Sequence, residues 1–301
     1  MKRIEYKDVD SIVQEYRNLF SQYIEEMQNK WCELREEYHE LNAFPKNVVN
    51  ILTAKFDNLA LYYIDYQKNT SVTTECVAKL KELFDYKKKQ SKIADFFMKH
   101  SKEMGISTCC YCDMSYVNVY SVKYNKNHSH FDLDHFFSQS DCPLLALSIF
   151  NLIPSCPVCN ERLKHNKQLG SNYDEFKKLS PSSLWYSFDD DVKIKLMQKK
   201  IYKIPNFSEN QENFFIRFDT QSDQYKKEIE MFSLNERYEF HKCEALRLLD
   251  LQQKYNDTHI KMISRLLNRS EDSIKEDIFH NNFMTSQKRT FSKLYNDILN
   301  Y

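Results

Sequence analysis

Two pairs of cysteines constrain the fold of this 301-residue chain more than any other feature of its sequence. Cys109 and Cys112 form one CxxC pair, and Cys156 and Cys159 form the second. Four thiolates offered in two such pairs are the ligand set that a tetrahedral zinc ion prefers. The stretch between the pairs is longer than in a compact zinc ribbon, so we expect a small subdomain there whose ends a structural zinc ion holds together.

Two other interpretations of these cysteines compete with a zinc site. A redox role is less favoured, because thioredoxin-like CxxC motifs do not occur as two distant pairs. Buried cysteines that act as small hydrophobic residues are the plainer alternative. Cys110 adds an ambiguity, since a CxC arrangement would use it in place of Cys109. The other cysteines are expected in the core: Cys32, Cys76, Cys142 and Cys243.

Composition excludes two classes of protein. The chain has only two glycines, where average usage of about 7% would give roughly twenty, so a glycine-rich phosphate loop or dinucleotide fingerprint is impossible. Its 43 basic and 43 acidic residues leave no net charge with which to grip nucleic acid, so any such contact must come from local clusters or a partner. One local cluster, YKKKQSK at 86–92, is more typical of a solvated helix face than of a phosphate contact.

Apolar periodicity predicts an α+β fold that is mostly helical and has three parts. The N-terminal region, 1–104, repeats apolar residues at three- and four-residue steps, as amphipathic helices do. The C-terminal region, 171–301, combines two strand candidates with further helical patterns. The elements expected in these two regions are helices over 7–41, 47–68, 73–102, 235–255 and 258–278, and strands over 191–197 and 213–219.

The central region, 105–170, contains both cysteine pairs and has the pattern of a hairpin. Alternating β-branched and aromatic residues predict a strand over 116–124, and the residues NKNHS at 125–129 predict a turn. The segment 130–137 is then expected to return as the second strand, and the second half of 151–167 suits a short helix. The region therefore predicts two strands between the cysteine pairs and a short helix that starts near the second pair.

Hydropathy gives an expectation for localisation. No stretch approaches about 20 consecutive apolar residues, so no membrane span is expected. The first residues lack the apolar core of a secretory signal. We therefore expect a cytoplasmic protein, whose thiols stay reduced.

An aspartate–histidine pair lies between the cysteine pairs, at the end of a predicted strand. Magnesium ions prefer oxygen ligands, typically one or two carboxylates and a substrate phosphate. A histidine can act as a general base on water near neutral pH. Asp134 and His135 therefore place a candidate metal ligand beside a candidate base. Such a dipeptide is usually structural when it stands alone, but here its position among the other motifs favours chemistry.

The order of these motifs resembles that of the HNH endonuclease family, whose core is a β-hairpin and a helix around one catalytic metal ion. The family's pattern is a CxxC pair, a strand ending in Asp-His, an Asn-Leu, and a second CxxC pair followed by His or Asn and a basic residue. Residues 105–170 carry matching pieces in that order: the pair Cys109 and Cys112, Asp134-His135, Asn151-Leu152, and the pair Cys156 and Cys159 followed by Asn160 and Lys164.

The resemblance implies a role for each matched residue. His135 would be the general base that deprotonates the attacking water, and Asp134 would be a ligand of catalytic Mg²⁺ or Mn²⁺. Asn160 would be the second ligand at a position where many members have histidine, and Asn151 would orient the loop that carries His135. Lys164 would contact the substrate phosphate, with a solvated helix lysine as the alternative. Weaker candidates are Asp132 for the metal, Arg162, His165 and Lys167 for phosphate, and His128 and His130, which are more typical of a solvated turn.

The implied activity is metal-dependent hydrolysis of DNA that leaves a 5′ phosphate and a 3′ hydroxyl. Phrases at 134–160, 230–242 and 290–299 look like HNH proteins of bacterial anti-phage, retron and Septu-type systems, which implies antiviral defence with an SMC-like ABC ATPase as partner. Two other functions stay open. One is a zinc-stabilised nucleic-acid-binding or adaptor module without catalysis, and the other is an RNA-cleaving toxin that uses the same site.

Overall fold

A computed structural model gives the structure of residues 1–301, except 70–71, 123–125, 201–205, 280–288 and 300–301 and the side chains of 119–122 and 126–128. Helices dominate the described residues, and the strands form three two-stranded antiparallel sheets. The predicted class, α+β and mostly helical, is therefore confirmed.

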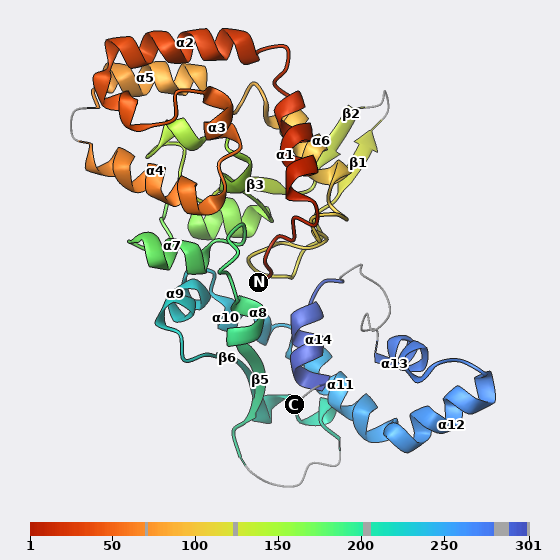
Figure 1. Cartoon of the computed structure of the whole chain (residues 1–301). Coiled ribbons are helices and arrows are strands. Elements are labelled where there is room, and N and C mark those ends of the chain that lie inside the picture. The colour runs from red at the N-terminus through yellow and green to blue at the C-terminus, as the bar shows by residue number, and fades with distance from the viewer. Residues whose placement is uncertain (70–71, 123–125, 201–205, 280–288, 300–301) are drawn as a thin grey trace.

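The N-terminal region is helical throughout, but its helices are shorter than predicted (Figure 1). Each of the three long helices expected from periodicity is divided in two. The sequence does not reveal these breaks, because the apolar residues keep their three- and four-residue spacing through the turns that separate the helices. The side chains of Asn47 and Thr73 accept backbone hydrogen bonds and so fix two of the helix starts. The helices are α1 (Val9–Asn18), α2 (Ile24–Glu37), the 3₁₀ turn η1 (His39–Ala43), α3 (Val48–Leu52), α4 (Phe56–Lys68), α5 (Thr74–Leu83) and α6 (Gln90–Lys99).

The central region pairs its strands differently from the prediction. The strand β1 (Val119–Val122) pairs with β2 (Lys126–Ser129), which occupies most of the segment expected to be a turn. The next strand, β3 (Asp132–His135), pairs instead with β4 (Leu152–Ser155). All four residues of β4 are buried, and so are the last three of β3. A buried strand needs a buried partner for its backbone groups, which the exposed end of β2 does not offer.

Short helical segments complete the central region. Two 3₁₀ turns, η2 (Pro143–Leu145) and η3 (Ile149–Asn151), connect β3 to β4. The predicted short helix is present as η4 (Val158–Lys164), which is wound as a π-helix with hydrogen bonds from residue i+5 to residue i. The amide of His165 donates to the carbonyl of Asn160 at 2.7 Å in this pattern. Single turns of π-helix occur frequently at functional sites.

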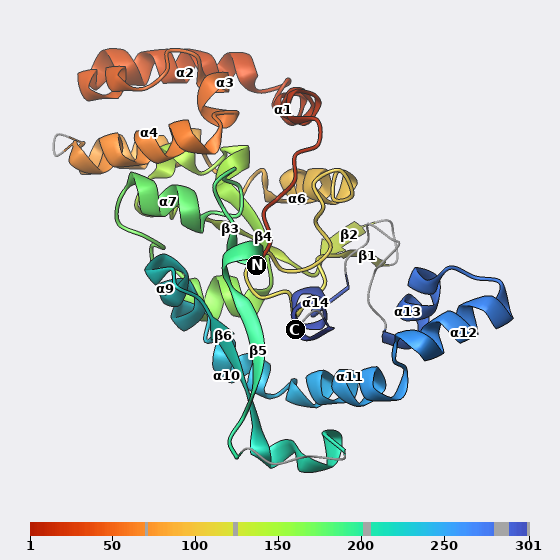
Figure 2. The ribbon, with the colours of Figure 1, turned by 60° about the horizontal axis from the view of Figure 1, so that its bottom comes forward.

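The C-terminal region contains the predicted strand pair and a series of helices (Figure 2). The strands β5 (Lys193–Gln198) and β6 (Phe214–Asp219) are present where the sequence predicts strands, and they pair as one antiparallel ribbon. The two predicted helices are again divided, one of them at Asn268, whose left-handed backbone ends α12. The helices are α7 (Tyr173–Leu179), α8 (Phe188–Asp191), η5 (Ser208–Asn213), α9 (Asp223–Met231), α10 (Leu234–Glu239), α11 (Lys242–Lys254), α12 (Asp257–Leu267), α13 (Glu271–Phe279) and α14 (Ser292–Leu299).

One continuous hydrophobic core connects the three regions, from Met1 to Ile298. The rings of Phe56 and Tyr63 on α4 stack on Phe137, with centroids 5.7 Å and 4.3 Å apart. Phe137 lies two residues after the end of β3, so helix α4 covers the end of the strand that carries the Asp-His pair. The N-terminal helices therefore contribute to holding the candidate site in place.

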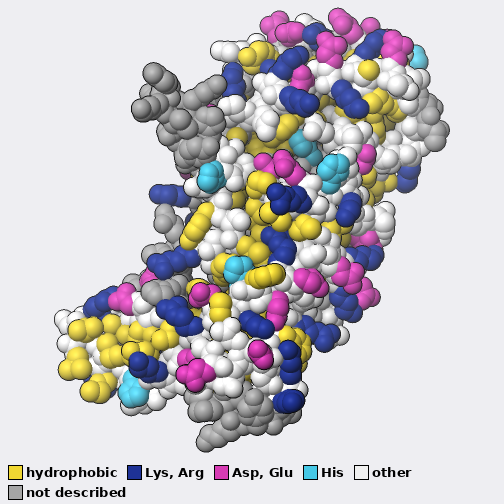
Figure 3. Space-filling model, turned by 180° about the vertical axis from the view of Figure 1, so that it is seen from behind, with side chains coloured by type: hydrophobic (Ala, Val, Ile, Leu, Met, Phe, Trp, Pro, Cys, Tyr) yellow, Lys and Arg dark blue, Asp and Glu magenta, His cyan; other side chains and the backbone are white. Residues whose placement is uncertain are grey.

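The surface mixes both signs of charge, in keeping with the balanced composition (Figure 3). Hydrophobic side chains gather at the end of the molecule where α12 lies, and the exposed ones on that helix are Met262, Leu266 and Leu267. None of the helices in the described part of the chain has both the length and the apolar character needed to cross a membrane.

Glu228 on α9 is a buried carboxylic acid that should make stability depend on pH. Burial raises its pKa to about 7, although the N-terminal amine and the Tyr186 hydroxyl both lower it. The folded state therefore holds a proton that the unfolded chain releases above about pH 4.5. This contribution to the free energy of unfolding is complete below that pH and is lost as pH rises to about 7, and it amounts to about 3 kcal/mol.

We predict that Glu228→Gln removes this dependence, because the amide keeps an acceptor for the Tyr186 hydroxyl without an ionisable group. Denaturant unfolding of both proteins at pH 5 and pH 8 measures the effect. The variant should gain stability relative to the natural protein between these two pH values. An equal difference at both would contradict the assignment.

Candidate metal centre and active site

The four cysteines of the two CxxC pairs converge in the structure. The sulfur atoms of Cys109, Cys112, Cys156 and Cys159 all lie within 4.8 Å of one another, and all four residues are buried. Tetrahedral Zn–S bonds of about 2.3 Å would place the sulfurs about 3.8 Å apart. The Cys112 and Cys156 sulfurs are 3.8 Å apart, which fits that geometry and is far beyond the length of a disulfide bond. The cluster can therefore hold a metal ion such as zinc, with Cys109 and not Cys110 as its member.

Local structure explains how the two pairs meet. The first pair lies in a turn closed by a bridge between Thr108 and Tyr116. The second pair begins where β4 ends and finishes in the first turn of η4. The backbone amide of Cys156 donates to the Cys109 sulfur at 3.3 Å, as amides do to thiolate ligands. The cluster thus ties the loop that precedes β1 to the junction of β4 and η4.

The C-terminal region closes over this cluster through α10. Nη1 of Arg237 donates to the sulfur of Cys159 at 3.3 Å, and the hydroxyl of Tyr238 donates to the carbonyl of Cys112 at 2.7 Å. Burial alone would lower the pKa of Arg237, but the thiolates of Cys159 and Cys112 outweigh it and raise that pKa. The guanidinium therefore stabilises the charged form of the thiolates that a metal requires. Sequence reasoning gave Arg237 no role, although the residue lies within the phrase at 230–242, because it is distant in the chain from both cysteine pairs.

A second cluster of polar residues lines a cavity of about 230 Å³ beside the cysteines. The structure brings together here the predicted site residues Asp134, His135 and Asn160, and also the weaker candidates Asp132 and His165. The strand β3, the helix η4 and the connection between α5 and α6 form its walls. Asn151 and Lys164 are close to this group but do not line the cavity.

Two side-chain contacts join strand β3 to helix η4. Residues 132 and 134 share one face of the strand, since side chains alternate along it. Asn160 Nδ2 donates to Asp132 Oδ2 at 3.2 Å, and Lys164 Nζ donates to Asp134 Oδ1 at 3.0 Å. Asn160 and Lys164 are about one helical turn apart, and they contact the alternate strand residues Asp132 and Asp134. These two contacts hold the helix against the hairpin.

Asp134 and Lys164 form a buried ion pair with 2% and 1% of their side chains exposed. Burial raises the pKa of Asp134, whereas the charge of Lys164 and the hydroxyl of Tyr111, which donates to Oδ2 at 2.6 Å, lower it. The Lys164 ammonium also donates to the carbonyl of His135 at 2.8 Å. Both acceptors lie inside the protein, so this ammonium is directed away from the position that the expected phosphate contact needs.

His135 ends strand β3 with a buried imidazole. Its Nε2 lies 2.9 Å from the carbonyl of Ala146. A carbonyl can only accept, so Nε2 carries the proton and Nδ1 is the nitrogen that can accept one. The pKa of His135 is lowered to about 4, mainly by burial and to a smaller extent by the charge of Lys164, although the hydrogen bond to Ala146 raises it. The imidazole is therefore neutral at neutral pH, the form that a general base requires.

Asn151 holds the chain on either side of the histidine loop. Its Oδ1 accepts from the amide of Phe137 at 2.8 Å, and its Nδ2 donates to the carbonyls of Phe137 and Leu145 at 3.1 Å and 3.0 Å. The side chain is fully buried. These bonds connect the segment after His135 to the segment before Ala146, which supplies the acceptor for the imidazole.

The remaining predicted residues lie at the edge of the site. His165 is exposed and lines the cavity, with a positive φ of 47° at the end of η4. Arg162, Lys167 and His130 are exposed and do not line the cavity, and the side chain of His128 lies outside the described residues. Sequence reasoning missed Tyr111, inside the first cysteine pair, and Tyr86, whose ring meets that of His135 edge-on with centroids 4.6 Å apart. The signal for Tyr86 is its place at the start of the lysine run.

Comparisons with protein-family models, with curated proteins and with solved structures found no match for this chain.

Replacing a cysteine of the cluster should release the metal and destabilise the central region. We predict that purified protein contains about one zinc ion per chain and that Cys156→Ser contains almost none, because three thiolates bind zinc much more weakly than four. Metal analysis and thermal unfolding measure both effects. Cys110→Ser and Cys243→Ser, outside the cluster, serve as controls that should keep the metal. A variant Cys156→Ser with a full complement of zinc would disprove the ligand set.

The buried ion pair should show strong energetic coupling. Lys164→Met leaves the Asp134 carboxylate buried without its counter-ion and should cost about 3–5 kcal/mol of unfolding free energy. The double variant with Asp134→Asn should cost much less than the two single changes together. Lys226→Met provides a surface control, since its pair with Asp223 is exposed and should contribute less than about 1 kcal/mol. Urea unfolding of the four proteins measures the coupling, and additive effects would contradict it.

Proposed function

We propose that this protein is a metal-dependent endonuclease of the HNH type that hydrolyses phosphodiester bonds in DNA. One observation carries the proposal. The neutral His135, the carboxylate Asp132 and the amide Asn160 line a single cavity built on the hairpin β3–β4 and the helix η4. The junction of β4 and η4 meets the loop that carries Cys109 and Cys112 at the cysteine cluster. The products are a 5′ phosphate and a 3′ hydroxyl.

His135 is the general base of this proposal. Its burial keeps the imidazole neutral, its bond to Ala146 leaves Nδ1 as the proton acceptor, and Asn151 fixes the loop around it. A base held in this way can take the proton of a water molecule as that water attacks the phosphorus. General-base catalysis of this kind typically contributes about 10²–10⁴ in rate.

Asp132 and Asn160 support a site for Mg²⁺ or Mn²⁺. Both are half-buried, both line the cavity, and they lie within 3.2 Å of each other. Carboxylate and amide oxygens suit a hard cation, which would offset negative charge on the phosphate and on the leaving oxygen. Asp134, the ligand expected from the family pattern, has both oxygens engaged by Lys164 and Tyr111. We therefore assign the more open ligand position to Asp132 and a positioning role to Asp134.

The zinc ion has a structural role in this proposal. It connects the hairpin to the preceding loop, and it needs no open coordination position because four cysteines complete its shell. The resemblance of the motifs extends the proposal to antiviral defence with an SMC-like ABC ATPase as partner.

Two alternatives use the same residues differently. A binding or adaptor module would need the cysteine cluster but not a neutral, buried histidine beside a carboxylate. An RNA-cleaving enzyme would share the whole site and differ in substrate. A single assay with plasmid DNA and with RNA, with Mg²⁺ and with EDTA, separates all three.

We predict cleavage of DNA that depends on Mg²⁺ or Mn²⁺ and falls at least about 10²-fold in His135→Ala, because the attacking water loses its base. His39→Ala, an exposed histidine of η1, is the matched control and should keep full activity. Asp132→Asn and Asn160→Ala should raise the concentration of metal needed for half-maximal rate. Zinc content should be the same in all variants, and cleavage that survives His135→Ala would show that the base is assigned wrongly.

A further inference from the structure

The connection between α5 and α6 forms one wall of the candidate active-site cavity, although it belongs to the N-terminal helical region. Tyr86, Lys87 and Gln90 line the cavity opposite β3 and η4. Tyr86 is buried with its ring edge-on against His135, and its carbonyl accepts from the amide of Lys89 at 2.9 Å. This contact and this turn place Lys87 at the cavity that His135 also lines.

The charges around the cavity leave one place for an anion. Asp132, Asp134 and Glu161 line it and carry carboxyl groups. The positive charge of Lys164 is already paired with Asp134 inside the protein. Of the described residues that line the cavity, Lys87 is the one lysine or arginine. Lys87 is therefore the permanent positive charge of the cavity that a phosphate group could contact.

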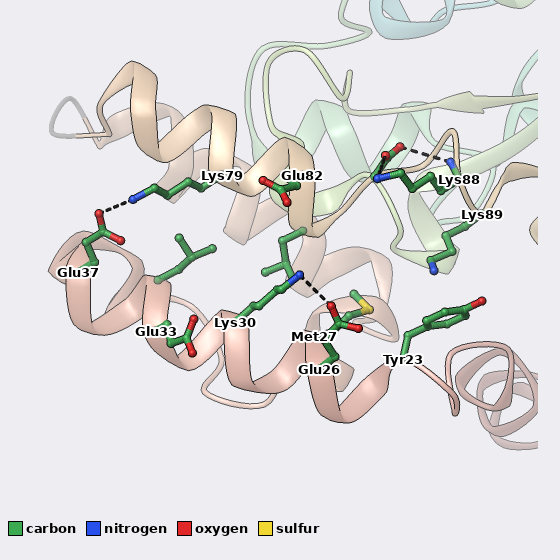
Figure 4. Close-up of a pocket in the computed structure, with 13 residues that line it drawn as sticks. Tyr23, Glu26, Met27, Lys30, Glu33, Glu37, Lys79, Glu82, Lys88 and Lys89 are labelled. Atoms are coloured by element: carbon green, nitrogen blue, oxygen red, sulfur yellow. Dashed lines mark hydrogen bonds and ion pairs between the residues drawn. The ribbon is translucent and has the colours of Figure 1, made fainter.

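The three lysines of the run 87–89 point to different places, which a uniformly solvated helix face does not explain. Lys88 pairs with Asp85 at 3.2 Å, and the ammonium of Lys89 lies 3.3 Å from the centre of the Tyr23 ring (Figure 4). Both line a separate cavity between α2 and α5. Lys87 is exposed at the catalytic cavity and has no ion-pair partner within the described part of the chain.

We propose that Lys87 binds a backbone phosphate of the DNA strand at the mouth of this cavity, so that the N-terminal helical region supplies part of the substrate site. The inference rests on the proposed endonuclease function. Of the three lysines at 87–89, this proposal assigns a phosphate contact to Lys87 alone. Lys87 then has the role that the motif pattern attributes to Lys164.

DNA binding by full-length variants tests the proposal separately from catalysis. Fluorescence anisotropy with a labelled duplex in EDTA, at several salt concentrations, compares the natural protein with Lys87→Ala, Lys87→Arg and Lys88→Ala. Lys87→Ala should weaken binding about three- to tenfold near 0.1 M salt and should lower the slope of log affinity against log salt by about one. Lys87→Arg should restore both values, and Lys88→Ala, which removes the same charge one residue away, should change neither.

The outcomes separate the two hypotheses. Equal effects of Lys87→Ala and Lys88→Ala would overturn the assignment of Lys87, even if the protein cleaves DNA. A selective loss of binding in Lys87→Ala without any metal-dependent cleavage by the natural protein would support the phosphate contact and disprove the endonuclease. Failure of the natural protein to bind DNA would overturn both.

Discussion

The convergence of four cysteine sulfurs is the constraint on which the rest of the central region depends. It joins the loop that carries the first pair to the junction of β4 and η4, and the hairpin β3–β4 beside it is only four residues long on each side. Two short strands are marginal on their own in water. A bound metal ion would add its binding energy to the packing of this region, and Arg237, which donates to the Cys159 sulfur, would offset the thiolate charge.

The buried pair of Asp134 and Lys164 shows that the walls of the candidate cavity require the burial of charged groups. Two charges are removed from water, and the pair stabilises the protein only because each partner finds further hydrogen bonds, to Tyr111 and to the His135 carbonyl. The same bonds fix β3 against η4. The hydrogen bonds and the ion pair of Asp134 therefore help to fix the position of the next residue, His135. A polar network whose groups all have partners keeps the wall of the cavity rigid.

Residue spacing predicts those parts of the site whose residues lie close together in the sequence. It does not predict the direction in which their side chains point. The cysteine cluster follows from two CxxC pairs because metal geometry admits few alternatives. Periodicity predicts helices but not their breaks, and alternation does not reveal that β3 pairs with β4 instead of returning along β1. The direction of Lys164 depends on the π-winding of η4, and the position of Lys87 depends on the contact of Tyr86 with His135, and neither has a local signal.

The cysteine cluster and the cavity are joined by neighbouring residues. Cys159, a cluster member, directly precedes Asn160, which lines the cavity. Tyr111 lies between the two cysteines of the first pair, and its hydroxyl donates to the Asp134 carboxylate. A shift of the second cysteine pair would therefore move Asn160, and a shift of the first pair would remove the hydrogen bond that Asp134 accepts from Tyr111. The cysteine cluster and the candidate site therefore share a helix and a turn, so the geometry of one sets that of the other.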